Sequence, residues 1–168
     1  MGVKIRDKNK IPELIKSLND LKSKSIKVGI FGEDDSHILM IANVHEYGAS
    51  ITVTPKMRGW FMYQGYFLSP NTTQINIPER SFMRSGYDNN KKELERLCLK
   101  GVKKILASKI DATQAMELIG TWLVSKIQSH LRDLKSPPNA QMTVDLKKSS
   151  NPLIDTGRLI QSITYKVE

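Results

Sequence analysis

The sequence predicts an α+β fold, in which a small, mostly antiparallel sheet is packed by helices. Two observations lead to this expectation. Apolar residues recur at helical spacings of three and four in several long segments, and short alternating segments typical of strands stand apart from them. The length of 168 residues suits a single domain covering residues 1–168.

The first half of the chain mixes both patterns. The expected order is a helix over 11–21, a strand over 25–31, a helix over 37–47 and a short strand over 51–54. Pro12 suits the first turn of the first helix. Asp35 or Ser36 is expected to cap the second helix, and Gly48 to end it.

The second half is dominated by helical spacing. The expected elements are a strand over 74–77, a helix over 88–108 with Leu106 on its inner face, a helix over 111–134, a helical turn over 157–161 and a strand over 163–167. The two long helices form the helical pair, and Asp111 with Gln114 is a capping box. We expect an aromatic hairpin or loop insertion over 57–73 and a loop over 136–152, with one short turn of helix within residues 139–152.

The composition excludes several classes of protein. No apolar run approaches the roughly 20 residues of a membrane-spanning helix, so no membrane is expected. The single cysteine, Cys98, rules out a disulfide within the chain and favours a reducing compartment. The formal net charge of +9 favours nucleic acid or acidic protein surfaces as partners.

Basic residues recur along the 88–108 helix. This basic stripe consists of Lys92, Arg96, Lys100, Lys103 and Lys104. One interpretation is a surface for DNA phosphates or an acidic neighbour. The other, which we favour from the sequence, is the solvated back of an amphipathic helix.

Aromatic residues cluster in the 57–73 segment: Trp60, Phe61, Tyr63, Tyr66 and Phe67. Such residues either fill a core or anchor an interface. Other segments already supply a core, so a partner interface is the hypothesis for this cluster.

Motifs for catalysis or metal binding are weak. His45 and Glu46 lack the second histidine of a zinc-protease helix, and His37 lies too far from His45 to share an ion. We therefore expect no metal and no cofactor. The segment 153–157 resembles the Asp-Thr-Gly motif of retroviral-type aspartic proteases, which makes catalysis through Asp155 a remote alternative.

Two features argue against that protease. Arg158 stands where a small residue is expected, and few residues follow Gly157 to build a flap. The preferred interpretation is that Asp155 or Thr156 caps a short helix.

Three ordered segments carry a resemblance to a known family. They are Ile41 to Gly48, ending in His-Glu-Tyr-Gly; Ile77 to Arg84; and the C-terminal set of 138–147, 152–159 and 162–165. Their order and spacing resemble the tail-completion, or neck, proteins of long-tailed bacteriophages and prophages. That group is similar to phage virion-morphogenesis and head–tail joining proteins. The resemblance covers about residues 25–168, with Ser81 where the family often has Pro.

The resemblance implies a structural virion protein without enzymatic activity, assembled in the bacterial cytoplasm and located in the neck or tail. Its partners would be tail-tube, terminator or head-connector proteins, and its copies would form a ring, with six subunits suspected. DNA in the channel of such a ring is a further contact. A basic DNA-binding protein is the alternative function.

The resemblance also assigns structural roles to matching residues. Those expected to act as joints are His45, Glu46, Tyr47, Gly48, Pro78, Arg80, Phe82, Arg84, Asp155, Thr156, Gly157 and Leu159.

Overall fold

A computed structural model of the protein describes residues 9–32 and 35–168. The fold is α+β, as the sequence predicts. Its helices are α1 (Ile11–Ser23), α2 (Ser36–Tyr47), α3 (Pro55–Tyr63), α4 (Phe82–Leu106), α5 (Ala112–Asp133), α6 (Gln141–Lys147) and α7 (Arg158–Gln161). Its strands are β1 (Ile26–Gly29), β2 (Ala49–Thr52), β3 (Gln74–Ile77) and β4 (Thr164–Val167).

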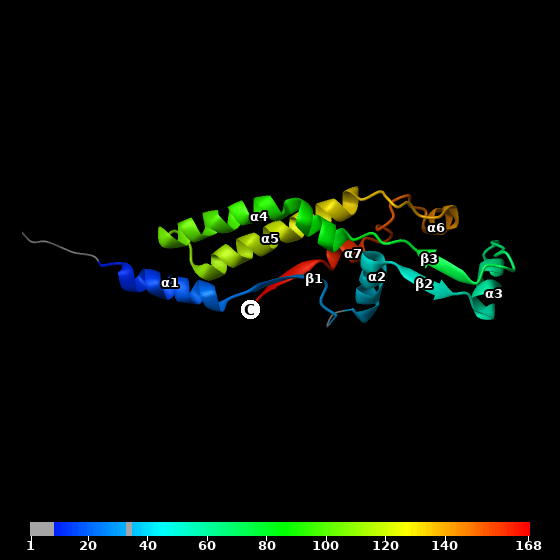
Figure 1. The fold of residues 1–168 in the computed structure, drawn as a ribbon, viewed down its shortest axis with the longest axis horizontal. Coiled ribbons are helices and arrows are strands. Elements are labelled where there is room, and N and C mark those ends of the chain that lie inside the picture. The colour runs from blue at the N-terminus through cyan, green and yellow to red at the C-terminus, as the bar shows by residue number, and fades with distance from the viewer. Residues whose placement is uncertain (1–8, 33–34) are drawn as a thin grey trace, which may run out of the picture.

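The body of the molecule is the antiparallel pair of α4 and α5, joined by a short turn (Figure 1). Asp111 and Gln114 form the predicted capping box at the start of α5. Strands β1 and β4 pair in antiparallel register, from Ile26 opposite Val167 to Gly29 opposite Thr164, and lie on α5.

Gly120 lets β4 approach α5 closely. A Cβ atom at this position would lie 2.4 Å from the Tyr165 ring. Any larger side chain would therefore push the strand away from the helix.

Strands β2 and β3 form a second antiparallel pair, from Ala49 opposite Ile77 to Thr52 opposite Gln74. This pair extends away from the body and carries α3 at its far end (Figure 1). Helix α1 lies at the opposite end of the elongated molecule. The expected small sheet is thus divided into two separate pairs.

The hydrophobic core lies where α2, α4, α5 and α7 meet. Phe82 and Leu131 are fully buried there, and Ile163 and Leu159 pack beside them. This core fixes the start of α4 against the end of α2.

Several sequence predictions are corrected by the structure. Helix α4 begins at Phe82 and not at Asp88, because its first N–H groups are capped from a distant part of the chain. Leu106 is 44% exposed and lies off the inner face of α4.

The segment 57–73 is not a hairpin. Its first part belongs to helix α3, because the Thr54 side chain accepts the Met57 N–H and Pro55 occupies the first turn. This start signal is visible in the sequence. Within the loop expected over 136–152, the predicted turn of helix corresponds to the short helix α6.

The cap expected before α7 is also wrong. Gly157, with φ of 81°, occupies the N-cap position, and no side chain caps the helix. Neither Asp155 nor Thr156 makes the predicted bond.

Candidate functional site

The residues that the family resemblance singles out between positions 45 and 84 meet at one place, where the end of α2 lies against the start of α4. We call this place the joint and define it as residues 45–48, 78–84 and 137–139. The buried Glu46 carboxylate accepts the backbone N–H groups of Met83 and Arg84 at 2.9 and 3.0 Å. These N–H groups have no partner within a helix, so Glu46 acts as the cap of α4.

Arg84 completes the contact in the opposite direction. Its Nε donates to the Glu46 carboxylate at 3.0 Å, and its second guanidinium nitrogen donates to the Glu46 backbone carbonyl at 2.9 Å. The guanidinium also lies 4.9 Å from the centre of the Tyr47 ring and binds Glu79. The hydrogen bond that the Arg84 side chain donates to the Glu46 carboxylate raises the pKa of Arg84. Each helix end is therefore satisfied by the other helix.

Arg80 ties the C-terminal segment to the joint. This buried side chain donates to the carbonyls of Pro137 and Pro138 at 2.7 and 2.9 Å, and to the Asn139 side chain. Its backbone N–H binds the carbonyl of His45. Burial lowers the pKa of Arg80. Arg80 thus holds three segments together, one through its guanidinium and one through its backbone N–H.

Gly48 allows the chain to leave α2 in the required direction. Its φ is 73°, which favours glycine, and a Cβ here would lie 3.0 Å from the Ile77 carbonyl oxygen. The neighbouring Pro78 is exposed, while Phe82 is fully buried. The joint is therefore a packed structural corner.

A small cavity of about 270 Å³ lies beside the joint and is lined in part by His45, Lys147 and Asp155. Among the described residues, His45 Nδ1 is the buried side-chain atom without a hydrogen-bond partner. Burial, followed by the charges of Arg80 and Lys147, lowers the pKa of His45 from 6.5 to about 4. Burial also lowers the pKa of Lys147, which donates to the Pro152 carbonyl. His45 is thus held neutral.

The Asp-Thr-Gly segment forms an exposed turn before α7. Asp155 and Thr156 are exposed, Gly157 adopts the left-handed conformation, and Leu159 enters the core. Asp155 is the one carboxylate among the residues lining the nearby cavity. The turn positions Leu159 and the strand that follows.

The aromatic cluster divides between core and surface. We call residues 55–73 the tip. Trp60, Tyr63 and Phe67 are 49%, 86% and 81% exposed, so they form an aromatic surface. Phe61 is 8% exposed, and its assignment to a partner interface is wrong, because its ring is buried within the chain. The Tyr66 hydroxyl donates to Asp145 of α6 at 3.0 Å.

The tip is held in shape by Arg58. Its guanidinium donates to four backbone carbonyls, those of Leu68, Ser69, Pro70 and Thr72. Because these carbonyls belong to the loop after α3, the loop folds back on the helix. The exposed aromatic rings are presented on an ordered support.

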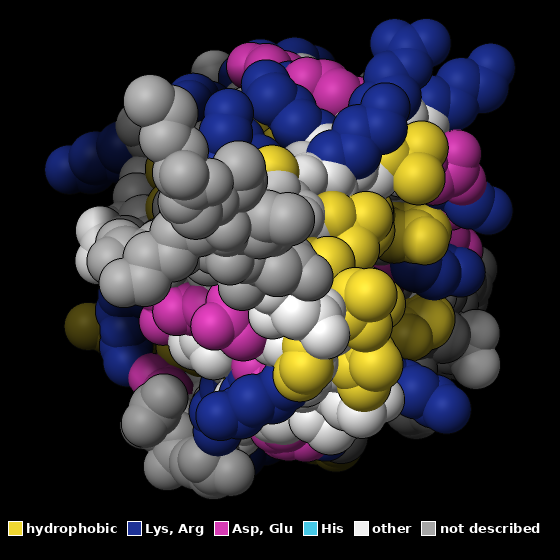
Figure 2. All heavy atoms as spheres, turned by 90° about the vertical axis from the view of Figure 1, so that its left-hand side faces the viewer, with side chains coloured by type: hydrophobic (Ala, Val, Ile, Leu, Met, Phe, Trp, Pro, Cys, Tyr) yellow, Lys and Arg dark blue, Asp and Glu magenta, His cyan; other side chains and the backbone are white. Residues whose placement is uncertain are grey.

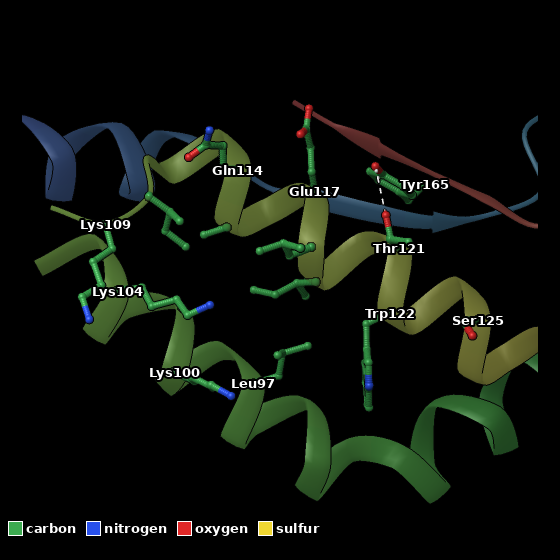
Figure 3. Close-up of a pocket in the computed structure, with 15 residues that line it drawn as sticks. Leu97, Lys100, Lys104, Lys109, Gln114, Glu117, Thr121, Trp122, Ser125 and Tyr165 are labelled. Carbon is green, nitrogen blue, oxygen red and sulfur yellow. Dashed lines mark hydrogen bonds between the residues drawn. The ribbon is translucent and has the colours of Figure 1, made fainter. Parts of the chain in front are cut away.

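A groove runs between α4 and α5 (Figure 3). This α4–α5 groove has a volume of about 960 Å³. In Figure 3, Trp122 reaches from α5 towards α4, and Lys104 extends from α4 into the same space. Aliphatic side chains line it, including those of Leu97, Leu118 and Ile119.

The basic stripe follows the outer side of α4 and ends at this groove. Lys92, Arg96, Lys100 and Lys103 are exposed and Lys104 is half-buried, and two of them, Lys100 and Lys104, also line the groove. The stripe thus changes from a solvated surface into one wall of the groove.

The sequence patterns did not identify a contact between Ser85 and His130 in the helical pair. The Ser85 hydroxyl donates to the Ser81 carbonyl, and His130 Nε2 lies 2.7 Å from the Ser85 oxygen. The pair links α4 to α5, and no sequence motif marks it.

No family model, no curated protein and no solved structure matches this chain. Within residues 9–32 and 35–168, no helix is long and apolar enough to cross a bilayer.

Proposed function

We propose that the protein is a structural subunit of a phage head–tail junction or tail end, which acts by assembling into a ring or docking on one. One observation carries the proposal. A single elongated chain exposes apolar side chains at both of its opposite ends (Figure 1). Such surfaces on a small chain are typical of protein interfaces.

At one end, helix α1 has an apolar edge that the chain leaves uncovered. Ile11, Ile15 and Leu18 are 63%, 54% and 41% exposed. Figure 2 views this end and shows hydrophobic side chains gathered in a band beside Lys and Arg residues. At the other end, the tip exposes its three aromatic rings.

The apolar edge of α1 and the aromatic rings of the tip are different surfaces at opposite ends of the chain. They favour heterologous contacts, in which the α1 edge of one copy meets the tip of another. Such contacts close into rings when the rotation between copies permits. The resemblance of the joint segments to phage tail-completion proteins supplies the biological setting. The joint would keep the arm, which is formed by β2 and β3 and carries the tip, at a fixed angle to the body, and a closed ring requires such a fixed angle.

The test is the light-scattering mass of the purified protein, alone and mixed with tail-tube or head-connector protein. We expect a discrete oligomer, or a monomer that joins the partner's particle. A monomer that binds neither tail-tube nor head-connector protein would contradict the proposal.

DNA binding is a second candidate function, favoured by the exposure of Lys92, Arg96 and Lys103 along one helix. It predicts duplex binding whose logarithmic affinity falls steeply with the logarithm of salt concentration. A titration at low and high salt tests it, and the absence of low-salt binding would exclude it.

A further inference from the structure

We infer that the α4–α5 groove binds an acidic amphipathic helix of a partner protein. The apolar side of that helix would lie on the floor of the groove, and its carboxylates would meet the lysines at the groove's edge. This inference rests on the proposed function, because it gives the chemistry of the segment through which a tail-tube or head-connector protein is bound. The tip and the α1 edge stay available for contacts between copies.

The groove is an apolar surface that the chain leaves uncovered. Within the part of the chain that the structure describes, it is lined by α4, α5, the turn between them and Tyr165 of β4, and neither α1 nor β1 contributes to it. Leu118 on its floor is 54% exposed, and Trp122 is half-buried. Uncovered apolar surfaces of this kind mark interaction sites.

The dimensions of the groove fit a short helix. Its lining on α5 extends from Gln114 to Ser125, which is about 16 Å at the α-helical rise of about 1.5 Å per residue. A helix of about 12 residues presents an apolar stripe of the same length. The trough between two packed helices suits the side-chain ridge of a third helix. The groove therefore has the form used in helix-in-groove recognition.

The edge of the groove favours negative charge in its occupant. Lys100, Lys104 and Lys109 line it, and Glu117 is the one carboxylate among the lining residues. In Figure 3, Lys104 extends into the groove and Glu117 points away from α4. Among residues 9–32 and 35–168, none of these four side chains takes part in an ion pair. Lys100 and Lys104 lie one helical turn apart, so carboxylates one turn apart on a docked helix can meet both.

The chain's own exposed apolar surfaces do not carry this negative charge. The tip contains Lys56 and Arg58 and no acidic residue. Helix α1 has two acidic and two basic residues, so it brings no excess of carboxylates. The occupant is therefore a segment of another protein and not a second copy of this chain.

An acidic helix also fits the groove better than DNA does. Lysines bind DNA phosphates without needing an apolar surface beside them. Lys92 and Arg96 already offer such charge on the exposed side of α4, outside the groove. Covering Leu118 and Trp122 stabilises a complex only when the partner is itself apolar there.

The probe for the test is a synthetic, fluorescein-labelled peptide of about 14 residues. Its leucines at positions i, i+3, i+4 and i+7 form one stripe, and glutamates flank this stripe. One control peptide has the same composition in an order that breaks the stripe. A second control peptide keeps the stripe and has lysine in place of every glutamate. Binding to the full chain is measured by fluorescence anisotropy at physiological salt concentration.

The first pair of variants tests the charge at the edge of the groove. The groove variant carries Lys100→Glu and Lys104→Glu. The matched control carries Lys92→Glu and Arg96→Glu, which make the same charge change at the same spacing on α4 but outside the groove. The groove variant should bind the acidic peptide at least about tenfold more weakly than the wild type. The control should lose less than about threefold, because salt screens charges at a distance.

The second pair of variants tests the apolar floor without changing any charge. Leu118→Ser should weaken binding at least about fivefold, because less apolar surface is buried. Leu99→Ser is its control, since Leu99 is 64% exposed on α4 and lies outside the groove, and it should bind like the wild type. Circular dichroism and thermal melting establish that each variant is folded.

The wild type should bind the acidic stripe peptide at least about tenfold more tightly than either control peptide. Equal binding of the three peptides would overturn the inference, and so would groove variants that bind like the wild type. An equal loss in the Lys92→Glu, Arg96→Glu control would also overturn it and favour DNA as the partner of the whole basic stripe.

The mass measurement separates this inference from the proposed function. A wild type that joins tail-tube or head-connector particles but does not prefer the acidic peptide would overturn the groove's role and leave the proposed function standing. A wild type that prefers the acidic peptide but stays monomeric and joins neither particle would contradict the proposed function and support the groove as a site for an acidic helix.

Discussion

Glu46 and Arg84 bind each other through both side chain and backbone, and thereby cap the two helices that they join. The Glu46 carboxylate accepts N–H groups at the start of α4, and the Arg84 guanidinium binds the Glu46 carbonyl near the end of α2. The two residues are 38 positions apart in the sequence. The angle between arm and body depends on this contact.

Replacing Glu46 with Gln should lower the free energy of unfolding by about 2–3 kcal/mol, because hydrogen bonds to a buried carboxylate are lost. The measurement is chemical denaturation. Glu79→Gln is the control, since Glu79 binds the same Arg84 but is 53% exposed, and should cost less than about 1 kcal/mol. Equal losses for both variants would show that Glu46 is not the cap.

His45 should make stability fall in mild acid. Its pKa is about 4 in the folded protein and near 6.5 when unfolded, so the unfolded chain binds a proton first. The stability due to neutral His45 is complete above about pH 6.5 and is lost as the pH falls towards 4. Thermal melting from pH 7 to 4 should show a shallower decline in His45→Gln than in the wild type.

His37→Gln is the control for this pH series, because His37 is exposed on the same helix. It should follow the wild-type curve. A His45→Gln curve parallel to the wild type would contradict the buried neutral state.

Phe61 and Trp60 are adjacent, but substitution of Phe61 should change hydrogen exchange in the tip strongly and substitution of Trp60 should change it little. Phe61→Ala removes a buried ring, which costs about 3–5 kcal/mol in cores, and should loosen the tip. Hydrogen exchange over residues 55–73 should become at least about 30-fold faster. Trp60→Ala, at a half-exposed ring, should leave exchange nearly unchanged. Similar exchange in both variants would refute the assigned burial.

Gly120→Ala should destabilise the contact between α5 and β4 by about 1–3 kcal/mol, because the added methyl group meets the Tyr165 ring. Denaturation of the single variants and of the Gly120→Ala, Tyr165→Ala pair tests this. The two substitutions should be non-additive, since the smaller Tyr165 replacement removes the overlap. Gly59→Ala, where a Cβ meets nothing within 4 Å, should cause no loss.

Local chemistry made much of the fold predictable. Asp35 caps α2 by accepting the N–H groups of His37 and Ile38, and Asp111 caps α5, as residues within a few positions of a helix start can do. Apolar periodicity placed the helical pair and the final strand. The start of α3 also had a local signal at Thr54, which the aromatic content of the segment obscured.

What the sequence by itself determined was the fold class, the order of most elements and the caps made by near neighbours. Only the tertiary structure decided that α4 begins at Phe82, that Phe61 is buried beside exposed Trp60, and that Arg80 binds the segment 137–139. The physical reason is the separation along the sequence of the residues that interact. Periodicity and capping act over a few residues, whereas the start of α4 and the contact of Arg80 depend on groups brought together across 38 or more positions by the packing of the whole chain.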